Sequence, residues 1–495
     1  MQENKKDVRR WAGRELKKEG LILERFFRLS ENKTDITTEL IAGLATFITV
    51  AYILAINPEI LSASGMPKGG VFIATALAAA IGSAIMGFLA NYPFVLAPGL
   101  GINAFFSYTV VLLMGYSWQF ALLTVFIEGI IFLILSLTSV REKLFNSIPF
   151  SLKAAVAVGI GIFISFIALQ GGKIIVSNDV TLVGLVDFRC ADFHTTGIWT
   201  LLTLAGIIIT SAIIAKGIHA GILLGIFATW TIGIIAELVG IYVPNPEQGF
   251  NSIIPHFTNY FSSLDHTFSE FGVTCGALFN PESWTHTHDG VITGQGFSLL
   301  KSLDFVVVLF AFFFVDLFDT LGTLIGVSLK GGFLAKDGSL PRVSKALSAD
   351  AIATSAGAVL GTSTTTTFVE SAAGVSLGAR TGLTAVTAAA LFIASIFFAP
   401  IFLAIPSFAT APALFLAGFF MMSSVAKINF NEIGEAIPAF ICMIVMPLTY
   451  SISDGIMFGI ISYTLINIII GKIRKVHWIM MVLTVIFLLK YALMS

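Results

Sequence analysis

The sequence predicts an all-α polytopic membrane protein of about 14 transmembrane segments, arranged as two inverted repeats of seven. Three observations predict this fold. Apolar residues make up 56% of the 495 residues and charged residues 12%, whereas a soluble domain carries about 25% charged residues. The apolar residues gather in stretches close to the ~20 residues that cross a bilayer. Several short motifs of the first half recur, in the same order, in the second half.

The apolar stretches define the segments in chain order. The first seven run near 39–61, 70–90, 94–116, 119–138, 152–170, 197–215 and 219–241. The second seven run near 303–328, 345–361, 363–380, 382–404, 407–426, 432–450 and 453–471. The clusters of Lys and Arg between segments follow even-numbered ones, as the positive-inside rule requires when the N-terminus is cytoplasmic. Isolated Lys68, Lys173, Arg189 and Lys301 depart from this bias.

Five regions follow from this count. They are a basic arm (1–35), a first repeat (36–241), an extracytoplasmic loop (242–302), a second repeat (303–472) and a hydrophobic tail (473–495). The arm lacks the apolar stretch of a signal peptide, so it is either a solvated cytoplasmic arm or a helix on anionic lipid. The loop faces outside because no Lys or Arg occurs from Gly217 to Leu300. The run Trp478–Met494 spans, re-enters or lies in the interface, and the sequence leaves these three open.

Net charge and cysteine content exclude several classes of protein. The net charge of −1 gives no global field for nucleic acid. Three cysteines and the lack of an HExxH motif exclude a disulfide framework and the usual zinc sites, so we expect no metal or other cofactor. Cys190 and Cys275 fall in loops assigned to the outside, where oxidation is possible. The sequence is compatible either with a disulfide between them or with two free thiols. Cys442 is interpreted as a packing residue.

The inverted repeat is indicated by matched positions. The run 219–226 resembles 453–460, and Ile148-Pro149 opens the fifth segment as Ile405-Pro406 opens the twelfth. Because each repeat has an odd number of segments, the second copy enters the membrane from the opposite side. Secondary transporters commonly have this architecture.

The third and tenth segments are predicted to be broken helices. Pro93, Pro98, Gly99 and Gly101 weaken the helix in the third segment, so we expect extended backbone to Ala97 and a half-helix from about Pro98. In the tenth segment a run of Thr favours extended backbone, and Glu370-Ser371 then open a helix whose positive end suits a carboxylate. The two half-helices would direct their N-termini at each other across the membrane centre. Two continuous, mildly kinked helices are the alternative.

Three carboxylates lie at membrane depth: Asp316 and Asp319 in the eighth segment and Glu370 in the tenth. Each costs about 2.5–3.5 kcal/mol there on insertion scales, so such groups are functional candidates by default. A cap or a hydrogen bond to a neighbouring hydroxyl is the structural alternative for each. Glu128 is also buried and is interpreted as a packing group. Asn103, one turn into the first half-helix, could present both a donor and an acceptor to a ligand, or could be a packing residue.

The acidic site favours a ligand with several N–H donors, such as a flat heterocycle. Phenylalanines near the motifs could stack on its ring or belong to the core: Phe105, Phe106, Phe314, Phe318 and Phe368. An inorganic anion transporter of the same fold is the alternative, although it would favour basic residues in place of Asp319 and Glu370. An intramembrane enzyme would need a nucleophile with a base or metal ligands, and the histidines lie mainly in loops. We therefore expect a transporter and not an enzyme.

The motifs closely resemble those of the AzgA-like purine permeases of the nucleobase cation symporter-2 family. The resemblance covers residues 35–472 and is carried by the stretches 97–105, 315–323, 349–350 with 361–371, and 380–384. It implies a core domain of segments 1–4 and 8–11, a gate domain of segments 5–7 and 12–14, and a homodimer in the cytoplasmic membrane. It also implies proton-coupled uptake of adenine, guanine or hypoxanthine.

The resemblance further implies a substrate site of Gly101, Asn103, Asp316, Asp319 and Glu370, with the three carboxylates as proton-coupling candidates. More distant uracil and xanthine relatives align their acidic residue with Asp319, so the division of roles between Asp316 and Asp319 stays open. H⁺ and Na⁺ both remain open as the coupling ion.

Overall fold

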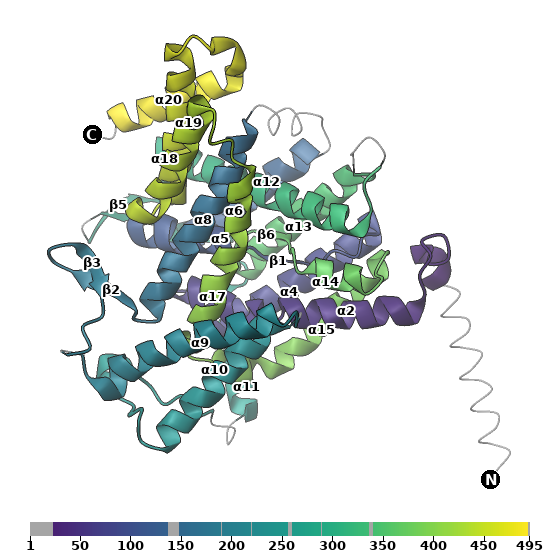
Figure 1. Cartoon of the computed structure of the whole chain (residues 1–495), viewed down its shortest axis with the longest axis vertical. Coiled ribbons are helices and arrows are strands. Elements are labelled where there is room, and N and C mark those ends of the chain that lie inside the picture. Colours follow the sequence, from purple (N-terminus) through teal and green to yellow (C-terminus); the bar gives the residue numbers. More distant parts are fainter. Residues whose placement is uncertain are drawn as a thin grey trace.

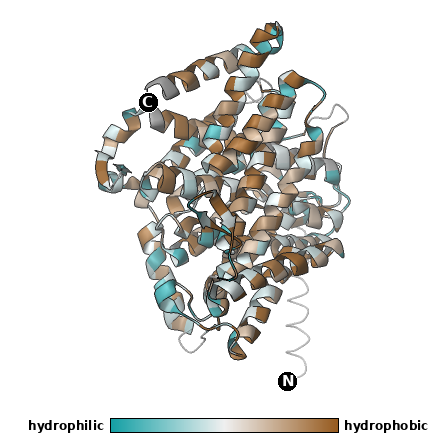
Figure 2. Cartoon of the chain, turned by 60° about the vertical axis from the view of Figure 1, so that its left-hand side comes forward, coloured by the Kyte–Doolittle hydropathy of each residue, from teal (hydrophilic) through white to brown (hydrophobic). Residues whose placement is uncertain are grey.

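The computed structural model describes residues 23–136, 148–189, 191–218, 220–255, 260–288, 290–335 and 340–493. Ten of the helices in these ranges are long and apolar enough to cross a membrane. The four other predicted segments are present as shorter or less apolar helices. The third and tenth are broken, the thirteenth is the 17-residue helix Ile433–Thr449, and the ninth, Val343–Leu360, carries Lys345 and Asp350. Figure 2 shows hydrophobic residues along most helices and hydrophilic ones mainly in the connections.

The long helices sort into two packed groups (Figure 1). Group one holds both broken segments and the helices α2 (Ile36–Val50), α3 (Ile53–Ser62), α4 (Lys68–Ile85), α6 (Trp118–Ser136), α12 (Leu303–Gly331), α13 (Val343–Leu360) and α15 (Gly382–Ser395). Group two holds α8 (Phe150–Gly171), α9 (Ile198–Ala215), α10 (Gly221–Leu238), α17 (Ser407–Met421), α18 (Ile433–Thr449) and α19 (Ile452–Ile469).

The two broken segments meet near the middle of the molecule (Figure 1). Strand β1 (Leu96–Pro98) pairs antiparallel with β6 (Thr365–Thr367), with Ala97 opposite Thr366. The short helices α5 (Leu100–Ala104) and α14 (Ser371–Ser376) follow the two strands. The predicted extended stretches and half-helices are therefore present, and the pairing satisfies backbone groups that lipid could not.

The predicted outer loop contains regular structure. Helix α11 (Tyr260–Thr274) packs against α4, where Glu270 Oε2 accepts a hydrogen bond from Gly69 N at 2.7 Å. The hairpin of β4 (Thr285–His288) and β5 (Val291–Gln295) follows, and Ser117 N donates to Thr285 O. A second hairpin lies outside this loop, in the connection between α8 and α9, and joins β2 (Ile175–Asn178) to β3 (Leu182–Leu185). We call the side of the molecule that carries α11 the loop side and the opposite side, where α2 begins, the N-terminal side.

Several sequence-based expectations concern residues that lie outside the ranges described by the structure. Residues 1–22 of the basic arm, His219 of the repeat motif and Cys190 are among them. Cys275 is an exposed free cysteine, which contradicts its pairing with Cys190 in a disulfide. In the tail, α20 (Trp478–Leu493) has 16 residues, fewer than the ~20 of a usual span. Its Phe487 ring lies 5.6 Å from that of Phe310 on α12, so α20 packs against the helix bundle.

Candidate functional site

Asp319 lies where α12 passes the paired strands. Thr366 of β6 donates a hydrogen bond from Oγ1 to Asp319 Oδ2 at 3.3 Å. A Cβ atom on Gly99, which precedes α5, would collide with the Thr366 side chain and come within 3.3 Å of Asp319 Oδ2. Gly99 therefore lets the first half-helix begin directly beside this carboxylate.

Glu370 occupies the N-cap of α14, as the sequence predicted. Its Oε1 accepts a hydrogen bond of 2.7 Å from the Tyr52 hydroxyl. Tyr52 is buried at the junction of α2 and α3, and its ring centroid lies 6.4 Å from that of Phe368. Sequence reasoning missed Tyr52, because an aromatic residue in an apolar segment carries no local sign of a carboxylate 318 residues away.

Asn103 is fully buried in α5 and its Nδ2 donates to Asn57 Oδ1 at 2.5 Å. Asn57, on α3, was not singled out by the sequence. Gly101 lies in the same half-helix but faces group two, since a Cβ there would come within 2.5 Å of Ile160 Cγ2 on α8. Gly101 therefore permits close contact between the groups.

Asp316 has different neighbours from Asp319. The hydroxyl of Thr320 lies 3.2 Å from Asp316 Oδ1 and 2.9 Å from Asp350 Oδ2, and both aspartates are fully buried. A hydroxyl donates only one proton, so Thr320 can fully satisfy only one of the two carboxyl groups or must share its proton between them. The structure thus groups Asp319 with Glu370 near the paired strands and Asp316 with Asp350 between α12 and α13.

A strip of α12 is accessible from Asp319 toward the N-terminal side. Gly322, Gly326 and Lys330 are exposed, and a Cβ atom on either glycine would meet open space. Next to Glu370, Val369 is 56% exposed. We call Asp319, Gly322, Thr323, Gly326 and Lys330 the accessible strip. It runs along α12 from Asp319 to Lys330 in the last turn of the helix.

A cavity of about 250 Å³ lies on the loop side, between the two groups. Its lining includes Glu59 of α3, Tyr108, and Ser407 and Thr410 of α17, and it includes neither Asp319 nor Glu370. Ser407 Oγ donates to Glu59 Oε1 at 2.6 Å, which joins the groups directly at this cavity.

The predicted aromatic residues lie mainly in the core. Phe105 and Phe106 are buried and their rings pack against Phe312, while Phe314 packs against Phe310. Phe368 is buried beside Tyr52, and the side chain of Phe318 lies outside the description. Glu128 is fully buried in α6, as expected.

Glu39 is a buried carboxylate that sequence reasoning overlooked. It lies on α2 and accepts hydrogen bonds from the backbone of Arg380 at 2.8 Å and Thr381 at 3.2 Å, and from Thr384 Oγ1 at 2.6 Å. It therefore satisfies the N-terminus of α15. This contact gives the motif at 380–384 a structural role.

Comparison with solved structures identifies the fold. The transmembrane domain of the cyanobacterial bicarbonate transporter BicA matches with a TM-score of 0.53 over 86% of this chain and 97% of that chain, at 14% identity. The murine Solute Carrier 26 family member A9 anion transporter in the inward-facing state matches with a TM-score of 0.57 over 88% of this chain and 68% of that chain, at 10% identity. This likeness confirms the predicted fold of two inverted repeats.

Comparison of sequences identifies relatives along nearly the whole chain. A putative permease, MJ0326, of Methanocaldococcus jannaschii is 44% identical over 96% of this chain and 99% of its own length. The guanine/hypoxanthine permease PbuG of Bacillus subtilis is 41% identical over 95% and 99%. The adenine permease AdeQ of Escherichia coli is 36% identical over 96% and 97%. The profile of the xanthine/uracil permeases, described as "Permease family", matches residues 37–458, and this multi-pass membrane protein belongs to that family of permeases.

Proposed function

We propose that this permease is a secondary active transporter of purine nucleobases, such as adenine, guanine or hypoxanthine. The observation that carries the proposal is that two carboxylates lie beside the paired strands, where the half-helices begin: Asp319 contacts Thr366 of β6, and Glu370 caps α14, which follows β6. Both groups accept hydrogen bonds, and a purine presents ring and exocyclic N–H donors. The names of relatives at 36–41% identity, a guanine/hypoxanthine permease and an adenine permease, support the same substrate class.

The acidic character of the site supports proton coupling. Neither Asp319 nor Glu370 forms an ion pair with any residue in the described ranges. A charged carboxylate at the membrane centre costs about 2.5–3.5 kcal/mol on insertion scales, so a proton taken up with the purine would favour movement of the loaded site. We assign the coupling proton to this pair and a positioning role to Asp316, through Thr320. Na⁺ is the alternative coupling ion, and exchange of Na⁺ for K⁺ in the uptake assay tests it.

Alternating access is proposed to move group one, as a core domain, against group two, as a gate domain. Two hydrogen bonds join the groups on the loop side: Ser407 to Glu59 at 2.6 Å and Thr109 Oγ1 to the carbonyl of Tyr450 at 2.9 Å. The accessible strip leads from Asp319 to the opposite side. With the N-terminus in the cytoplasm, as the positive-inside rule predicts, this arrangement is an inward-open state. We further propose that the protein forms a homodimer in the cytoplasmic membrane.

Uptake of radiolabelled hypoxanthine and adenine into proteoliposomes tests the proposal. An imposed inward proton gradient should accelerate uptake, collapse of the gradient should abolish accumulation, and exchange of Na⁺ for K⁺ should have no effect. Glu370→Gln and Asp319→Asn should each lower uptake at least tenfold, whereas Glu282→Gln, in the loop-side segment 281–283, should not. A rate of purine uptake that is the same with and without the proton gradient would refute proton coupling. Uptake of bicarbonate or sulfate in place of purines would favour an anion transporter.

A further inference from the structure

A chain of hydrogen bonds begins at the backbone of α4. Thr75 Oγ1 lies 2.6 Å from the carbonyl oxygen of Val71, and both residues are fully buried. A backbone carbonyl can only accept, so the single proton of the Thr75 hydroxyl is donated to it. The Thr75 oxygen can then only accept hydrogen bonds from its other neighbours.

The amide of Asn57 is oriented by this requirement. Its Nδ2 lies 2.7 Å from Thr75 Oγ1 and 2.9 Å from Thr362 Oγ1, so the two protons of the NH₂ group have separate acceptors. The reversed amide would place Oδ1 against a Thr75 hydroxyl whose proton is already used. Asn57 therefore turns its NH₂ group to Thr75 and its carbonyl to the opposite side, toward Asn103.

The orientation of Asn103 follows from that of Asn57. Because Asn57 Oδ1 can only accept, it takes a proton from Asn103 Nδ2 at 2.5 Å. This leaves Asn103 Oδ1 buried and without a hydrogen bond from any residue that the structure describes. An unpaired carbonyl oxygen in a buried position strongly favours a ligand that supplies a donor.

We propose that Asn57 is a positioning residue that locks the Asn103 amide, so that Asn103 presents the purine with an acceptor only. The inference rests on the proposed function and specifies how its site reads the substrate. Asp319 and Glu370 are acceptors on the second repeat, and Asn103 adds an acceptor from the first. A purine whose N–H at the Asn103 contact is replaced by a group without a proton is then rejected, because Asn103 cannot turn its NH₂ group to it.

A double-mutant cycle on purified full-length protein tests this coupling. Hypoxanthine affinity is measured by calorimetry for the wild type, Asn57→Leu, Asn103→Leu and the double variant. Each single substitution should weaken binding about tenfold, the usual loss for one buried hydrogen bond. The double variant should bind no more weakly than Asn103→Leu, since Asn57 acts through Asn103. Losses that multiply in the double variant would overturn the inference.

Substrate analogues separate a positioning role from a general structural one. The panel consists of hypoxanthines methylated at N1, N3, N7 or N9, each compared with hypoxanthine. The wild type should discriminate at least tenfold against methylation at the nitrogen that meets Asn103, and Asn57→Leu should reduce that discrimination while leaving the others unchanged. An equal loss for every analogue would show that Asn57 only supports the fold. Failure of the wild type to bind any purine would instead refute the proposed function.

A milder variant keeps the test valid if Asn57→Leu does not fold. Thr75→Val keeps the shape of the side chain and removes the oxygen that orients Asn57. It should relax the same discrimination, by less than Asn57→Leu because Thr362 still accepts from Asn57. Thr124→Val is the matched control, since Thr124 is equally buried and donates to the carbonyl of Phe120 within its own helix at 3.0 Å. A change of discrimination in the control equal to that in Thr75→Val would contradict the proposal.

Discussion

Glu59 and Ser407 join the two helix groups on the loop side. Ser407 Oγ donates to one oxygen of the Glu59 carboxylate at 2.6 Å, and Lys68 Nζ lies 2.6 Å from the other. Glu59 and Lys68 belong to group one, whereas Ser407 begins α17 of group two. Any opening of this side must separate the serine from the carboxylate.

Removal of this contact should shift the conformational equilibrium. Ser407→Ala deletes a hydrogen bond worth roughly 1 kcal/mol, enough to change the ratio of the two states about fivefold. A thiol introduced by Gly326→Cys, in a background without the native cysteines, reports access to the accessible strip. An impermeant thiol reagent on the N-terminal side should label it more slowly after Ser407→Ala, by at most about fivefold. Ser423→Ala, near the end of group two's α17, is the control and should leave the rate unchanged.

The contact of Gly101 with α8 should be sensitive to a single methyl group. Gly101→Ala places a Cβ about 2.5 Å from Ile160 Cγ2, so the half-helix and α8 must separate. We expect purine transport to fall at least tenfold, by analogy with the cost of overpacking a close helix contact. Ile160→Ala in the same chain should restore part of it. Gly171→Ala, where a Cβ meets nothing within 4 Å, should transport normally.

Thr320 should matter more for stability than for binding. Thr320→Val removes the hydroxyl shared by Asp316 and Asp350 and leaves two buried carboxyl groups without it, at a cost of roughly 1–3 kcal/mol. Thermal unfolding should therefore shift to lower temperature, while purine affinity falls less than in Asp319→Asn. A larger loss of affinity in Thr320→Val than in Asp319→Asn would place Asp316 in direct contact with the substrate.

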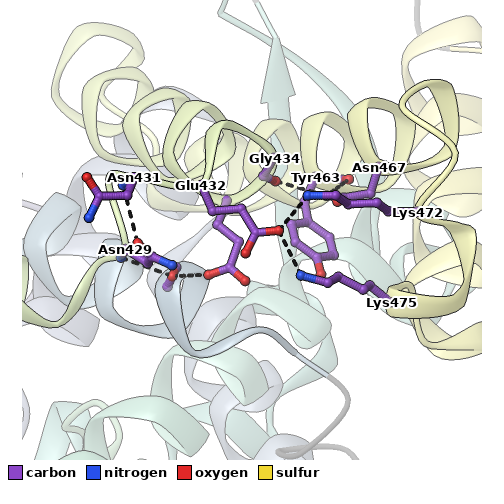
Figure 3. Close-up of polar contacts among 10 residues, drawn as sticks. Asn429, Asn431, Glu432, Gly434, Tyr463, Asn467, Lys472 and Lys475 are labelled. Atoms are coloured by element: carbon purple, nitrogen blue, oxygen red, sulfur yellow. Dashed lines mark hydrogen bonds and ion pairs between the residues drawn. The ribbon is translucent and has the colours of Figure 1, made fainter.

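Glu432 should stabilise the N-terminal side in a manner that depends on salt and pH. It lies before α18 and pairs with Lys472 at 2.8 Å and Lys475 at 2.7 Å, which follow α19 (Figure 3). Hydrogen bonds from Lys472 and then Lys475 lower the pKa of Glu432 to about 2 from its ordinary value of 4.5. Because the folded pKa is the lower one, the stabilisation is complete above about pH 4.5 and is lost as the pH falls toward 2.

The measurement is a comparison of melting temperatures for the wild type and Glu432→Gln. At neutral pH and low salt the variant should melt slightly lower, and 1 M salt should remove most of the difference, because the pair is partly exposed to solvent. Exposed Glu31→Gln, whose pair with Arg28 spans 3.8 Å, is the control and should show a smaller effect. If the difference in melting temperature persists at high salt, Glu432 stabilises the protein through packing and not through its charge.

The broken helices could be predicted from the sequence because their causes are local. Pro98 and Gly99 disfavour a helix where they stand, and the Thr run before Glu370 favours extended backbone. The carboxylates could be found for a similar reason, since a charge in an apolar stretch is conspicuous. The separation of Asp316 from Asp319 could not be predicted. Three residues leave about 60° between two side chains on a helix, and only the neighbouring helices decide what each one meets.

The sequence by itself determined that this is a membrane protein with two broken segments, two half-helices and three carboxylates at membrane depth, one of them at the start of a half-helix. Those features depend on hydropathy, proline, glycine and threonine preferences that act within a few residues. Only the tertiary structure decided that Tyr52 binds Glu370, that Glu39 caps α15 and that Asn57 orients Asn103. Hydrogen bonds join atoms brought together by packing, and the partners of Tyr52 and Glu39 lie more than 300 residues away in the chain.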